Sequence, residues 1–295
     1  MYASQQRLVT ADDYTALIMS SFSNVIDDII CWGGNENQPP KYGVVFVALK
    51  FKEGLSDLIQ DEYKRLIKDQ LTANLSIMSI DTEFVEPNEA FLELTTHFNI
   101  DPAKSGETVF SLEGKVKTYI DSYVQSEVGS FGSVFRRSNL LSSIDSISEA
   151  ILNSRMSVRI QQRVTDLNIG EEKDYTVNFP VVLASPDKDT HTVTTSIFRF
   201  RGQNVIIKNE LGSTRLQIFD LDDVVQIANV GSYDPAKGEV FLNALRVDER
   251  TTLKVSADPA NQATLRPLRN YIVSIDPTVS SVSGTLESSD VKVNL

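Results

Sequence analysis

The sequence predicts an α+β protein built from two domains. Residues 1–165 are expected to form a ferredoxin-like split βαβ domain with an extra helix and strand, because from residue 44 the predicted elements run strand, helix, strand, strand, helix, strand. Residues 166–295 are expected to form a mostly antiparallel β-sandwich or barrel-like domain, because helical periodicity ends near Thr165 while Thr, Val, Asn and Gly become more frequent. At 295 residues the chain is long enough for two cores.

A capped helix opens the predicted N-terminal domain. Thr10 is a good N-cap and Asp13 stands in the capping-box position, so the helix should begin directly after Thr10. Residues 25–32 and 44–49 follow as strands, and the second is apolar enough to be buried on both faces. A long loop rich in Gly and Pro joins them at residues 33–40. The apolar residues of the helix recur at helical spacing and predict one buried stripe: Tyr14, Leu17, Ile18 and Phe22.

A second helix and two more strands continue this domain. Ser56 is expected to cap the helix, whose apolar residues form one face: Leu55, Leu58, Ile59, Leu66, Ile67 and Leu71. Residues 77–85 and 90–100 are predicted to be strands joined by a turn that contains Pro87. In the second of these strands four apolar residues share one face, which is predicted to be buried: Leu92, Leu94, Phe98 and Ile100.

The strongest amphipathic helix is predicted to begin at Ser105 and to reach Val128. Its apolar residues keep three-and-four spacing: Val109, Leu112, Val116, Tyr119, Ile120, Tyr123 and Val128. A short helix capped by Ser138 and a strand over residues 156–164 complete the domain. Right-handed crossovers would place both long helices on one face of an antiparallel sheet, which the strand at residues 25–32 would extend.

Eight short strands are predicted in the C-terminal domain, separated by turns rich in Pro, Gly and Asp. They cover residues 175–183, 190–200, 204–208, 216–219, 224–230, 239–243, 252–256 and 271–275. Residues 233–238 give the clearest hairpin loop, with Pro at the first turn position and Gly at its end. From Thr278 the sequence is rich in Ser and ends with alternating apolar residues, which is typical of either an edge strand or disorder.

The net charge of −12 argues against general nucleic-acid binding, which needs clustered Lys and Arg to displace counterions. No apolar run approaches the roughly 20 residues of a membrane-spanning helix, and the first residues lack the features of a signal peptide. Cys31 is the only cysteine, so an intrachain disulfide is excluded. We therefore expect neither nucleic acid nor a membrane as a partner, and assembly in the cytoplasm.

Few residues offer catalytic or metal-binding chemistry. His97 has no partner at ligand spacing, and His191 stands beside Asp187 and Asp189 in a turn; both are expected at the surface, because a zinc site needs three or four convergent ligands. The run that contains Asp220, Asp222 and Asp223 resembles a calcium loop only in part, because the central Gly and the twelfth-position Glu are missing. Motifs for nucleotide binding and the Gly-x-Ser-x-Gly motif of hydrolases are missing too. We predict no catalytic residues, no metal site and no cofactor.

One basic patch stands out in this acidic chain and is a candidate interface: Arg136, Arg137, Arg155, Arg159 and Arg163. On a strand the last three share a face, so they would form a stripe that docks an acidic neighbour, including another copy of this chain. A solvated strand face is an equally weighted alternative. Trp32 and Tyr42 flank the Gly- and Pro-rich loop together with Phe46; they could anchor a contact, although such aromatics more often close a core.

The order of motifs in the first fifty residues resembles a known family. The pattern R-x-V-T-x-x-D-Y from Arg7 is followed by CWGG from Cys31, then by PPKYG from Pro39 and an apolar strand. This run resembles the baseplate J-like family of contractile-tail proteins, and within it the large wedge subunit of T-even-type phage baseplates. The resemblance is specific over residues 7–165. It begins so near Met1 that the chain resembles the C-terminal part of a longer protein.

The resemblance implies a virion structural protein of the tail baseplate, without enzymatic activity. Proteins in this position are expected to self-associate as dimers, to meet other wedge proteins and the tail hub, and to link wedges into a ring. They help carry the shape change that triggers sheath contraction. Two alternatives stay open: a tail-associated receptor or carbohydrate-binding protein, since β-rich domains can bind glycans, and a hydrolase, which would need two carboxylates roughly 5 to 10 Å apart.

Overall fold

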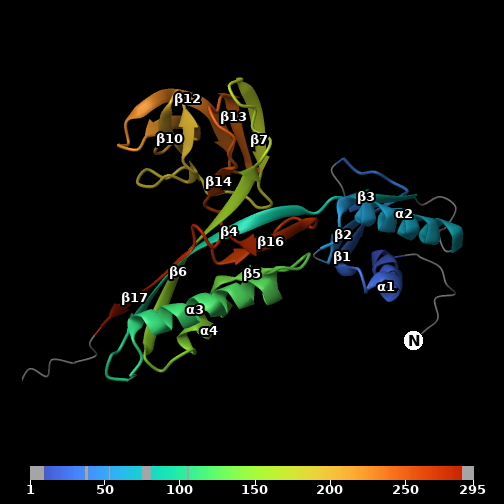
Figure 1. The fold of residues 1–295 in the computed structure, drawn as a ribbon, viewed down its shortest axis with the longest axis horizontal. Helices are drawn as coiled ribbons and strands as arrows, with labels where there is room; N and C mark the ends of the chain where they lie inside the picture. Colours follow the sequence, from blue (N-terminus) through green and yellow to red (C-terminus); the bar gives the residue numbers. More distant parts are fainter. Residues whose placement is uncertain (1–9, 37–38, 53, 75–80, 105, 288–295) are drawn as a thin grey trace, which may run out of the picture. The chain divides into compact units, whose positions relative to one another are not determined.

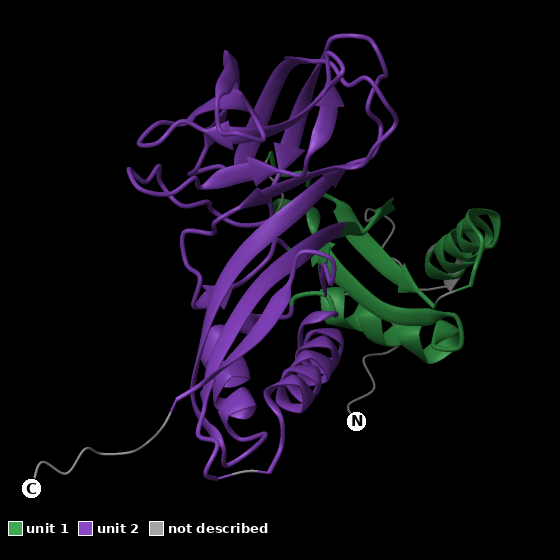
Figure 2. Cartoon of the chain, turned by 60° about the vertical axis from the view of Figure 1, so that its left-hand side comes forward, with its two compact units in different colours: residues 1–88, 130–132, 269–272 green, residues 89–129, 133–268, 273–295 purple. Residues whose placement is uncertain are grey.

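The computed structural model describes residues 10–36, 39–52, 54–74, 81–104 and 106–287. The chain forms two compact units, shown in different colours in Figure 2. Unit 1 contains residues 1–88, 130–132 and 269–272, and unit 2 contains residues 89–129, 133–268 and 273–295. Each unit has buried hydrophobic clusters of its own, so each is described separately.

Unit 1 is a three-stranded sheet with two α-helices (Figure 1). Its elements are α1 (Ala11–Phe22), β1 (Ile26–Gly33), the 3-10 helix η1 (Gly34–Glu36), β2 (Val44–Phe51), α2 (Asp57–Asn74) and β3 (Asp81–Val85). The strand order is β1-β2-β3, with β1 antiparallel and β3 parallel to β2. The predicted helix, strand, loop and strand at the start of the chain are confirmed. Of the strand predicted at residues 77–85, residues 77–80 lie outside the described residues.

The first helix begins where the sequence predicts. Thr10 Oγ1 accepts a hydrogen bond from Asp13 N at 3.3 Å, and the Asp13 carboxylate accepts one from Thr10 N at 2.8 Å. This capping box satisfies N–H groups that have no partner within the helix. The predicted stripe of α1 belongs to one core cluster, with some members buried and the others packed against it: Tyr14, Leu17, Ile18 and Phe22.

Strand β2 is buried on both faces, as predicted. Val45, Val47 and Leu49 belong to the core cluster that also contains buried residues of α1 and α2, so both helices cover this face of the sheet. Phe46 and Ala48 point to the opposite face, where they pack with an aromatic side chain of β1 and with a residue of the 130–132 segment. Alternation along a strand sends successive side chains to opposite faces.

The predicted apolar face of α2 is wrong in part. Ile67 and Leu71 are buried, but Leu58, Ile59 and Leu66 are 81%, 44% and 42% exposed. Because nine residues turn an α-helix about two and a half times, Leu58 and Ile67 point in opposite directions. One helix face therefore cannot hold all of the predicted residues, and α2 carries an apolar stripe on its outer side.

Unit 2 is built on a twelve-stranded, mostly antiparallel sheet. Its elements are β4 (Asn88–Ile100), α3 (Val109–Tyr123), the π-helix η2 (Val124–Val128), β5 (Phe135–Arg136), α4 (Arg137–Asp145), β6 (Ile151–Val164), β7 (Lys173–Asn178), β8 (Val193–Thr195), β9 (Phe198–Phe200), β10 (Gln203–Asn209), β11 (Arg215–Asp220), β12 (Val225–Asp234), β13 (Glu239–Leu245), β14 (Leu253–Ala257), β15 (Thr264–Leu265), β16 (Tyr271–Ile275) and β17 (Ser281–Leu286). The strand order is β16-β4-β6-β14-β8-β10-β11-β12-β13-β7, with β17 also on β4 and β9 also on β10. The α+β class is confirmed.

The single ferredoxin-like sheet predicted for residues 1–165 is not formed. Strands β2 and β3 pair in the sheet of unit 1, whereas β4 pairs with β6 in the sheet of unit 2. The chain at residues 86–87 therefore passes from one sheet to the other instead of closing a hairpin. Pro87 has no N–H to donate to a strand ladder, which suits a break in pairing. The sequence pattern predicts element types, but it does not decide which strands pair.

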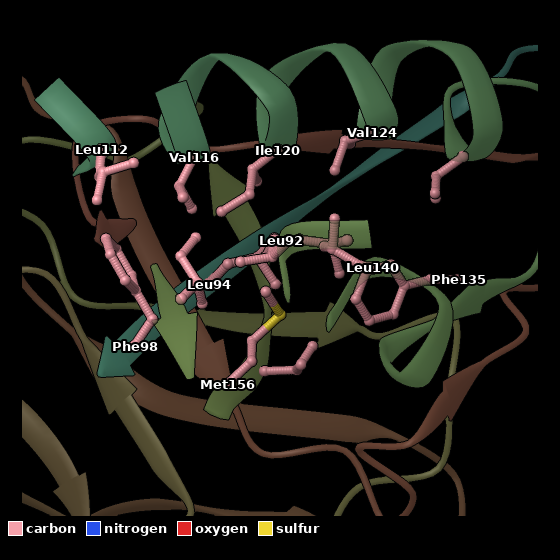
Figure 3. Close-up of a cluster of buried hydrophobic side chains, with 14 of the residues drawn as sticks. Leu92, Leu94, Phe98, Leu112, Val116, Ile120, Val124, Phe135, Leu140 and Met156 are labelled. Carbon is pink, nitrogen blue, oxygen red and sulfur yellow. The ribbon is translucent and has the colours of Figure 1, made fainter. Parts of the chain in front are cut away.

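A core cluster of unit 2 lies between α3 and the pair β4–β6. Figure 3 shows Leu112, Val116 and Ile120 of α3 pointing toward Leu94 and Met156 of the two strands. The predicted buried face of β4 is confirmed, because all four residues predicted to form it are at most 1% exposed: Leu92, Leu94, Phe98 and Ile100.

Helix α3 begins later than predicted. Ser105, the predicted start, lies outside the described residues. Thr108 is the cap of the helix, and its side chain accepts a hydrogen bond from Ser111 N at 3.2 Å. The predicted apolar residues do form one packed face, because four are buried in the core cluster and the other three pack against it.

Every strand predicted after residue 165 is present, with residues 190–200 divided between β8 and β9. The predicted loop at residues 233–238 joins β12 to β13, and Gly238 has a φ of 71° at its end. Of the segment from Thr278, expected to be either an edge strand or disordered, residues 281–286 form β17, while the alternating apolar residues at its end lie outside the described residues. No described residue after β6 is helical, but the two compact units divide at residues 88/89. The prediction that residues 1–165 and 166–295 are two separate domains therefore stays a prediction.

Candidate interaction surfaces

Arg159, the central residue of the predicted arginine stripe, is held inside unit 2. From β6 it donates through Nε to Asp258 Oδ1 and through Nη1 to Thr194 Oγ1, both at 2.8 Å. Its Nη2 donates to the carbonyls of Thr192 and Ser256 at 3.0 and 3.2 Å. Burial raises the pKa of Asp258, and the Arg159 guanidinium opposes that shift. Arg159 therefore ties β6 to β8 and β14.

Arg163 and Lys254 hold a buried carboxylate. Arg163 Nη2 and Lys254 Nζ lie 3.1 and 2.6 Å from Asp276 Oδ2, and the Asp276 side chain is 1% exposed. Asp276 Oδ1 accepts hydrogen bonds from Thr278 N and Oγ1 at 3.0 and 2.7 Å. Burial alone would raise the pKa of Asp276, but the bonds from Lys254 and Thr278 outweigh it and hold this pKa well below its usual range. The Arg163 guanidinium also lies 3.5 Å from the Phe91 ring centroid.

Glu93 and Gln161 join these two clusters into one network, which we call the β6 network. Gln161 Nε2 donates to Glu93 Oε1 at 2.7 Å, and the Ser256 hydroxyl donates to the same oxygen. Arg163 Nε donates to Gln161 Oε1 at 3.1 Å. Reversing the charge of Arg159 or Arg163 would place carboxylates against carboxylates, so we expect it to weaken folding and not only association.

The sequence analysis did not predict that Asp258 and Asp276, the two aspartates of the β6 network, bind these arginines. Each stands directly before a Pro and directly after a buried strand, β14 or β16. A carboxylate at that point can close a turn and still face the sheet, as Asp276 does through Thr278. That pattern is the signal that could have pointed to them.

The other candidate arginines differ in their surroundings. Arg155 is exposed on β6 opposite His97, and no ion pair is recorded for it within the described chain. Arg136 is exposed at the end of β5, whereas Arg137 Nη1 donates to the Met156 carbonyl at 3.3 Å. Arg155 and Arg136 are therefore the members of the predicted patch that are exposed and have no recorded ion pair within the described chain.

The two histidines bridge neighbouring segments. The His97 ring lies between two hydroxyls of β17, with Nδ1 3.0 Å from Ser283 Oγ and Nε2 3.2 Å from Thr285 Oγ1. His191 Nδ1 lies 2.6 Å from the Asn209 carbonyl oxygen.

Within the described part of the chain, no three His, Cys, Asp or Glu side chains gather in a way that could hold a metal ion. None of its helices is both long and apolar enough to cross a bilayer.

The Gly- and Pro-rich loop of unit 1 is closed by its own backbone. Lys41 N donates to Gly34 O at 2.8 Å, and a Cβ on Gly34 would lie 1.8 Å from the Lys41 carbonyl oxygen, so only glycine permits this approach. Trp32 is 8% exposed and stacks on Phe46 with ring centroids 5.6 Å apart. Trp32 therefore closes a core. Tyr42 is 80% exposed and stays a candidate contact residue.

The described residues of unit 2 line two candidate grooves. The first, of about 470 Å³, lies between α3 and the segment that leads into β17. Glu113 on its wall accepts a hydrogen bond from Gly284 N at 2.9 Å, and Phe110 at its edge is 84% exposed. The second, of about 440 Å³, lies among the loops of the β-rich part and contains Lys237 and Arg266. Neither groove has a signal in the sequence, because the walls of each come from distant segments.

Unit 1 contains the part of the chain that matches a known protein family. Residues 10–85 match the family model described as "Baseplate structural protein gp6, C-terminal domain I". This range runs from the cap of α1 to the end of β3, so it covers both helices and all three strands of that sheet. The Gly- and Pro-rich loop, which carries the sequence resemblance, lies inside it. The match therefore points to the class of phage baseplate structural proteins.

A curated relative extends this similarity beyond unit 1. Baseplate wedge protein gp6 of Enterobacteria phage T4 is 23% identical to this chain over 220 residues. The alignment covers 74% of this chain and 31% of that protein, so less than a third of the relative's length is matched. Together the matches support a structural role in a phage tail baseplate and favour a non-enzymatic protein. They support the wedge-protein resemblance, while the baseplate J-like assignment stays a prediction.

Proposed function

We propose that this chain is a wedge subunit of a contractile-tail baseplate, which self-associates and links wedges into a ring around the tail hub. The observation that carries the proposal is the match of the α1 to β3 segment to a gp6 domain, alongside the similarity to a baseplate wedge protein. In this role the subunit takes part in the baseplate shape change that triggers sheath contraction. The subunit is assembled in the host cytoplasm and is located in the virion tail. The segment from α1 to β3 would be the part that belongs to the baseplate J-like family.

Exposed side chains of the described residues suit a protein that acts by contact. The outer stripe of α2 exposes Leu58, Ile59 and Leu66, and the loop beside β2 exposes Tyr42. Exposed apolar and aromatic groups of this kind are typical of protein interfaces when they lie close together. Arg155 adds an exposed cation on β6. These groups are the candidate contacts to other wedge proteins and to a second copy.

A glycan-binding tail protein has less support. Recognition of sugar rings commonly uses exposed aromatic faces, which combine an apolar surface with a polar rim. The strongly exposed aromatic side chains in the described chain are Tyr42 and Phe110, and neither lies in the β-rich part after residue 165. We therefore expect no specific signal on a glycan array.

The proposed function predicts that the purified chain self-associates. Light scattering across a concentration series should give a dimer or a larger species, because the candidate contacts include surfaces for a second copy. Electron microscopy of the protein mixed with other baseplate wedge proteins should then show ordered wedges or rings. A monomer at every accessible concentration, together with no ordered particles in the mixture, would contradict the proposal.

Charge reversal at Arg155 tests the residue of the stripe that is exposed and has no ion pair recorded in the described chain. We expect Arg155→Glu to weaken self-association about tenfold, equivalent to about 1.4 kcal/mol, while Tm stays unchanged. Arg250→Glu is the matched control, because Arg250 is also exposed in unit 2 and no ion pair is recorded for it in the described chain. Equal association constants for the two variants would remove Arg155 from the interface.

A further inference from the structure

The second groove of unit 2 has an apolar floor and an open rim. It has a volume of about 440 Å³, and we call it the cationic groove; its lining includes Phe179, Val182, Lys237, Leu265, Arg266 and Leu268. Phe179 and Leu265 are buried, whereas Val182 and Leu268 are 54% and 60% exposed. Apolar side chains that stay exposed beside a buried apolar floor mark a place where a partner's apolar group can bind.

The charges of the cationic groove are all positive. Lys237 and Arg266 line it, and no carboxylate is among its described lining residues. Lys237 Nζ lies 4.0 Å from Asp234 Oδ2, which is a loose contact, and no ion pair is recorded for Arg266 within the described chain. The chain as a whole carries a net charge of −12, so this groove is locally opposite in sign. It fits a partner that brings an apolar side chain next to a carboxylate.

Backbone hydrogen bonds hold the walls of the cationic groove in place. Phe179 N donates to Gly238 O at 2.7 Å, and Leu268 N donates to Pro180 O at 3.1 Å. A Cβ on Gly238 would lie 2.4 Å from the Val181 carbonyl oxygen, so the two loops approach at a distance that only glycine permits. The groove is therefore formed before any partner binds, which lowers the entropic cost of association.

The turn between β11 and β12 has the complementary chemistry. We call residues 220–225 the acidic tip. Leu221, Val224 and Val225 are 59%, 56% and 44% exposed, which is unusual for three apolar residues in one short turn. Asp222 lies exposed among them, and no ion pair is recorded for it in the described residues. The acidic tip therefore presents apolar side chains around a carboxylate.

The acidic tip is rigid because one of its own carboxylates closes it. Asp220 Oδ1 accepts hydrogen bonds from Asp222 N and Val224 N, both at 2.9 Å, and Asp220 Oδ2 accepts one from Gln226 Nε2 at 2.8 Å. The partial likeness to a calcium loop thus has another explanation: this carboxylate binds the backbone of its own turn. Asp223, at a φ of 61°, pairs with Lys208.

We propose that the acidic tip of one copy docks into the cationic groove of a second copy. Leu221 and Val224 enter the apolar part of the groove, and Asp222 pairs with Arg266 and Lys237. The occupant is a second copy because the same chain carries both complementary halves, each preformed. This inference rests on the self-association in the proposed function and assigns residues to it.

The proposed contact is heterologous, because the two surfaces that meet are different. Each copy would use its tip toward one neighbour and its groove toward another. Because each copy can make this contact with two neighbours, copies can add one after another. They form a closed ring if the rotation from one copy to the next divides a full turn evenly, and an open chain if it does not. This distinguishes it from a twofold dimer, in which the same patch meets itself.

Charge reversal on each half provides the test. We expect Asp222→Lys alone, and Lys237→Glu with Arg266→Glu, each to lower the association constant at least tenfold in sedimentation velocity. Mixing the two variants should restore association, because the unchanged tip of the groove variant meets the unchanged groove of the tip variant, and the lysine tip meets the glutamate groove. Asp166→Lys and Arg250→Glu are the controls, since both residues are exposed in unit 2 and lie outside tip and groove.

The apolar side chains of the acidic tip are tested by a second variant and its control. Leu221→Ser should weaken association, whereas Leu211→Ser, at a residue that is 47% exposed outside the tip, should not. Self-association that persists unchanged in all tip and groove variants would overturn this contact and leave the proposed function standing. Loss of association in the groove variant alone would also overturn it, because another segment would then fill the groove. A wild-type chain that never associates would overturn both.

A disulfide between copies gives an independent readout. Leu221→Cys mixed with Leu268→Cys should form a cross-linked dimer under copper-phenanthroline oxidation, whereas neither variant alone should do so. The native Cys31 should stay out of this reaction, because burial raises its pKa to about 11 and leaves it as an unreactive thiol at neutral pH. Absence of the mixed disulfide, with both thiols accessible to a labelling reagent, would contradict the proposed docking.

Discussion

Replacing Asp276 with asparagine should lower the free energy of unfolding by about 3 kcal/mol, because removing one partner of a buried ion pair leaves the other charges uncompensated. Asparagine keeps the size of the side chain and an oxygen for the Thr278 hydrogen bonds, so the change isolates the charge. Arg163 and Lys254 keep 32% and 23% of their side chains exposed, which places the effect at the lower end of the usual range. Chemical denaturation at neutral pH measures it.

The matched control for this prediction is Asp234→Asn. Asp234 also precedes a proline and also accepts backbone hydrogen bonds in its turn, from Ala236 N and Lys237 N. Its cation, Lys237, is 4.0 Å away and 68% exposed, so the charge contributes little. We expect Asp234→Asn to cost well under 1 kcal/mol. Equal losses in the two variants would show that the turn, and not the buried charge, is responsible.

The effect of Asp276 should also depend on pH. Its pKa is depressed in the folded chain, so its charge contributes stability above the unfolded pKa of about 4, and this contribution is lost as pH falls toward the folded value. The difference in unfolding free energy between wild type and Asp276→Asn should therefore be full at neutral pH. It should shrink below about pH 4. A difference that stays constant across this range would contradict the assignment of a depressed pKa.

Gly34→Ala should lower the stability of unit 1 by about 3 kcal/mol, the upper part of the range for overpacking. The added Cβ would lie 1.8 Å from Lys41 O and 3.1 Å from Val44 O, and these are backbone atoms that cannot turn aside. Lys41 is further held by its bond to Gly34 O, and β2 begins at Val44. Hydrogen exchange should show the loss within β1 and β2, with the amides of unit 2 unaffected.

Gly33→Ala is the control for Gly34→Ala. A Cβ on Gly33 would meet Asn35 Oδ1 at 2.5 Å, but this atom is the end of a side chain that can adopt another rotamer. We therefore expect a loss of under about 1 kcal/mol for this neighbouring glycine. If both alanines are tolerated equally, the close approach of the loop to Gly34 does not matter for the stability of the fold.

The sequence predicted those features whose cause is local. The capping box of α1 involves residues three apart, and the burial of β2 follows from an unbroken apolar run. The turn before β13 follows from Pro and Gly at defined positions. By contrast, the face of α2 was predicted from apolar residues alone, and Leu58 shows that an apolar residue can point outward. Whether an apolar residue is buried depends on what the rest of the fold places against it.

The β6 network was harder to predict because the residues that bind its arginines are distant in sequence. Arg159 and Arg163 share a strand face as expected, but the carboxylates that bind them, Asp258 and Asp276, lie 99 and 113 residues further on. The same holds for pairing: β4 pairs with β6 and not with β3, although β3 is nearer in sequence. A spacing rule identifies which residues share a face, but only the fold decides whether that face meets another element or remains free.

The parallel pairing of β17 with β4 has a consequence for how the chain is made. Thr95 pairs with Ser281, and contacts between these strands join residues 186 positions apart, as for His97 and Ser283. At usual elongation rates a ribosome needs roughly 10 to 40 s to cover that distance. During this time the side of β4 that will accept β17 has no strand from its own chain, and such an edge can recruit strands from other nascent chains. A holding chaperone during translation should therefore raise the yield of native protein more than one added after release.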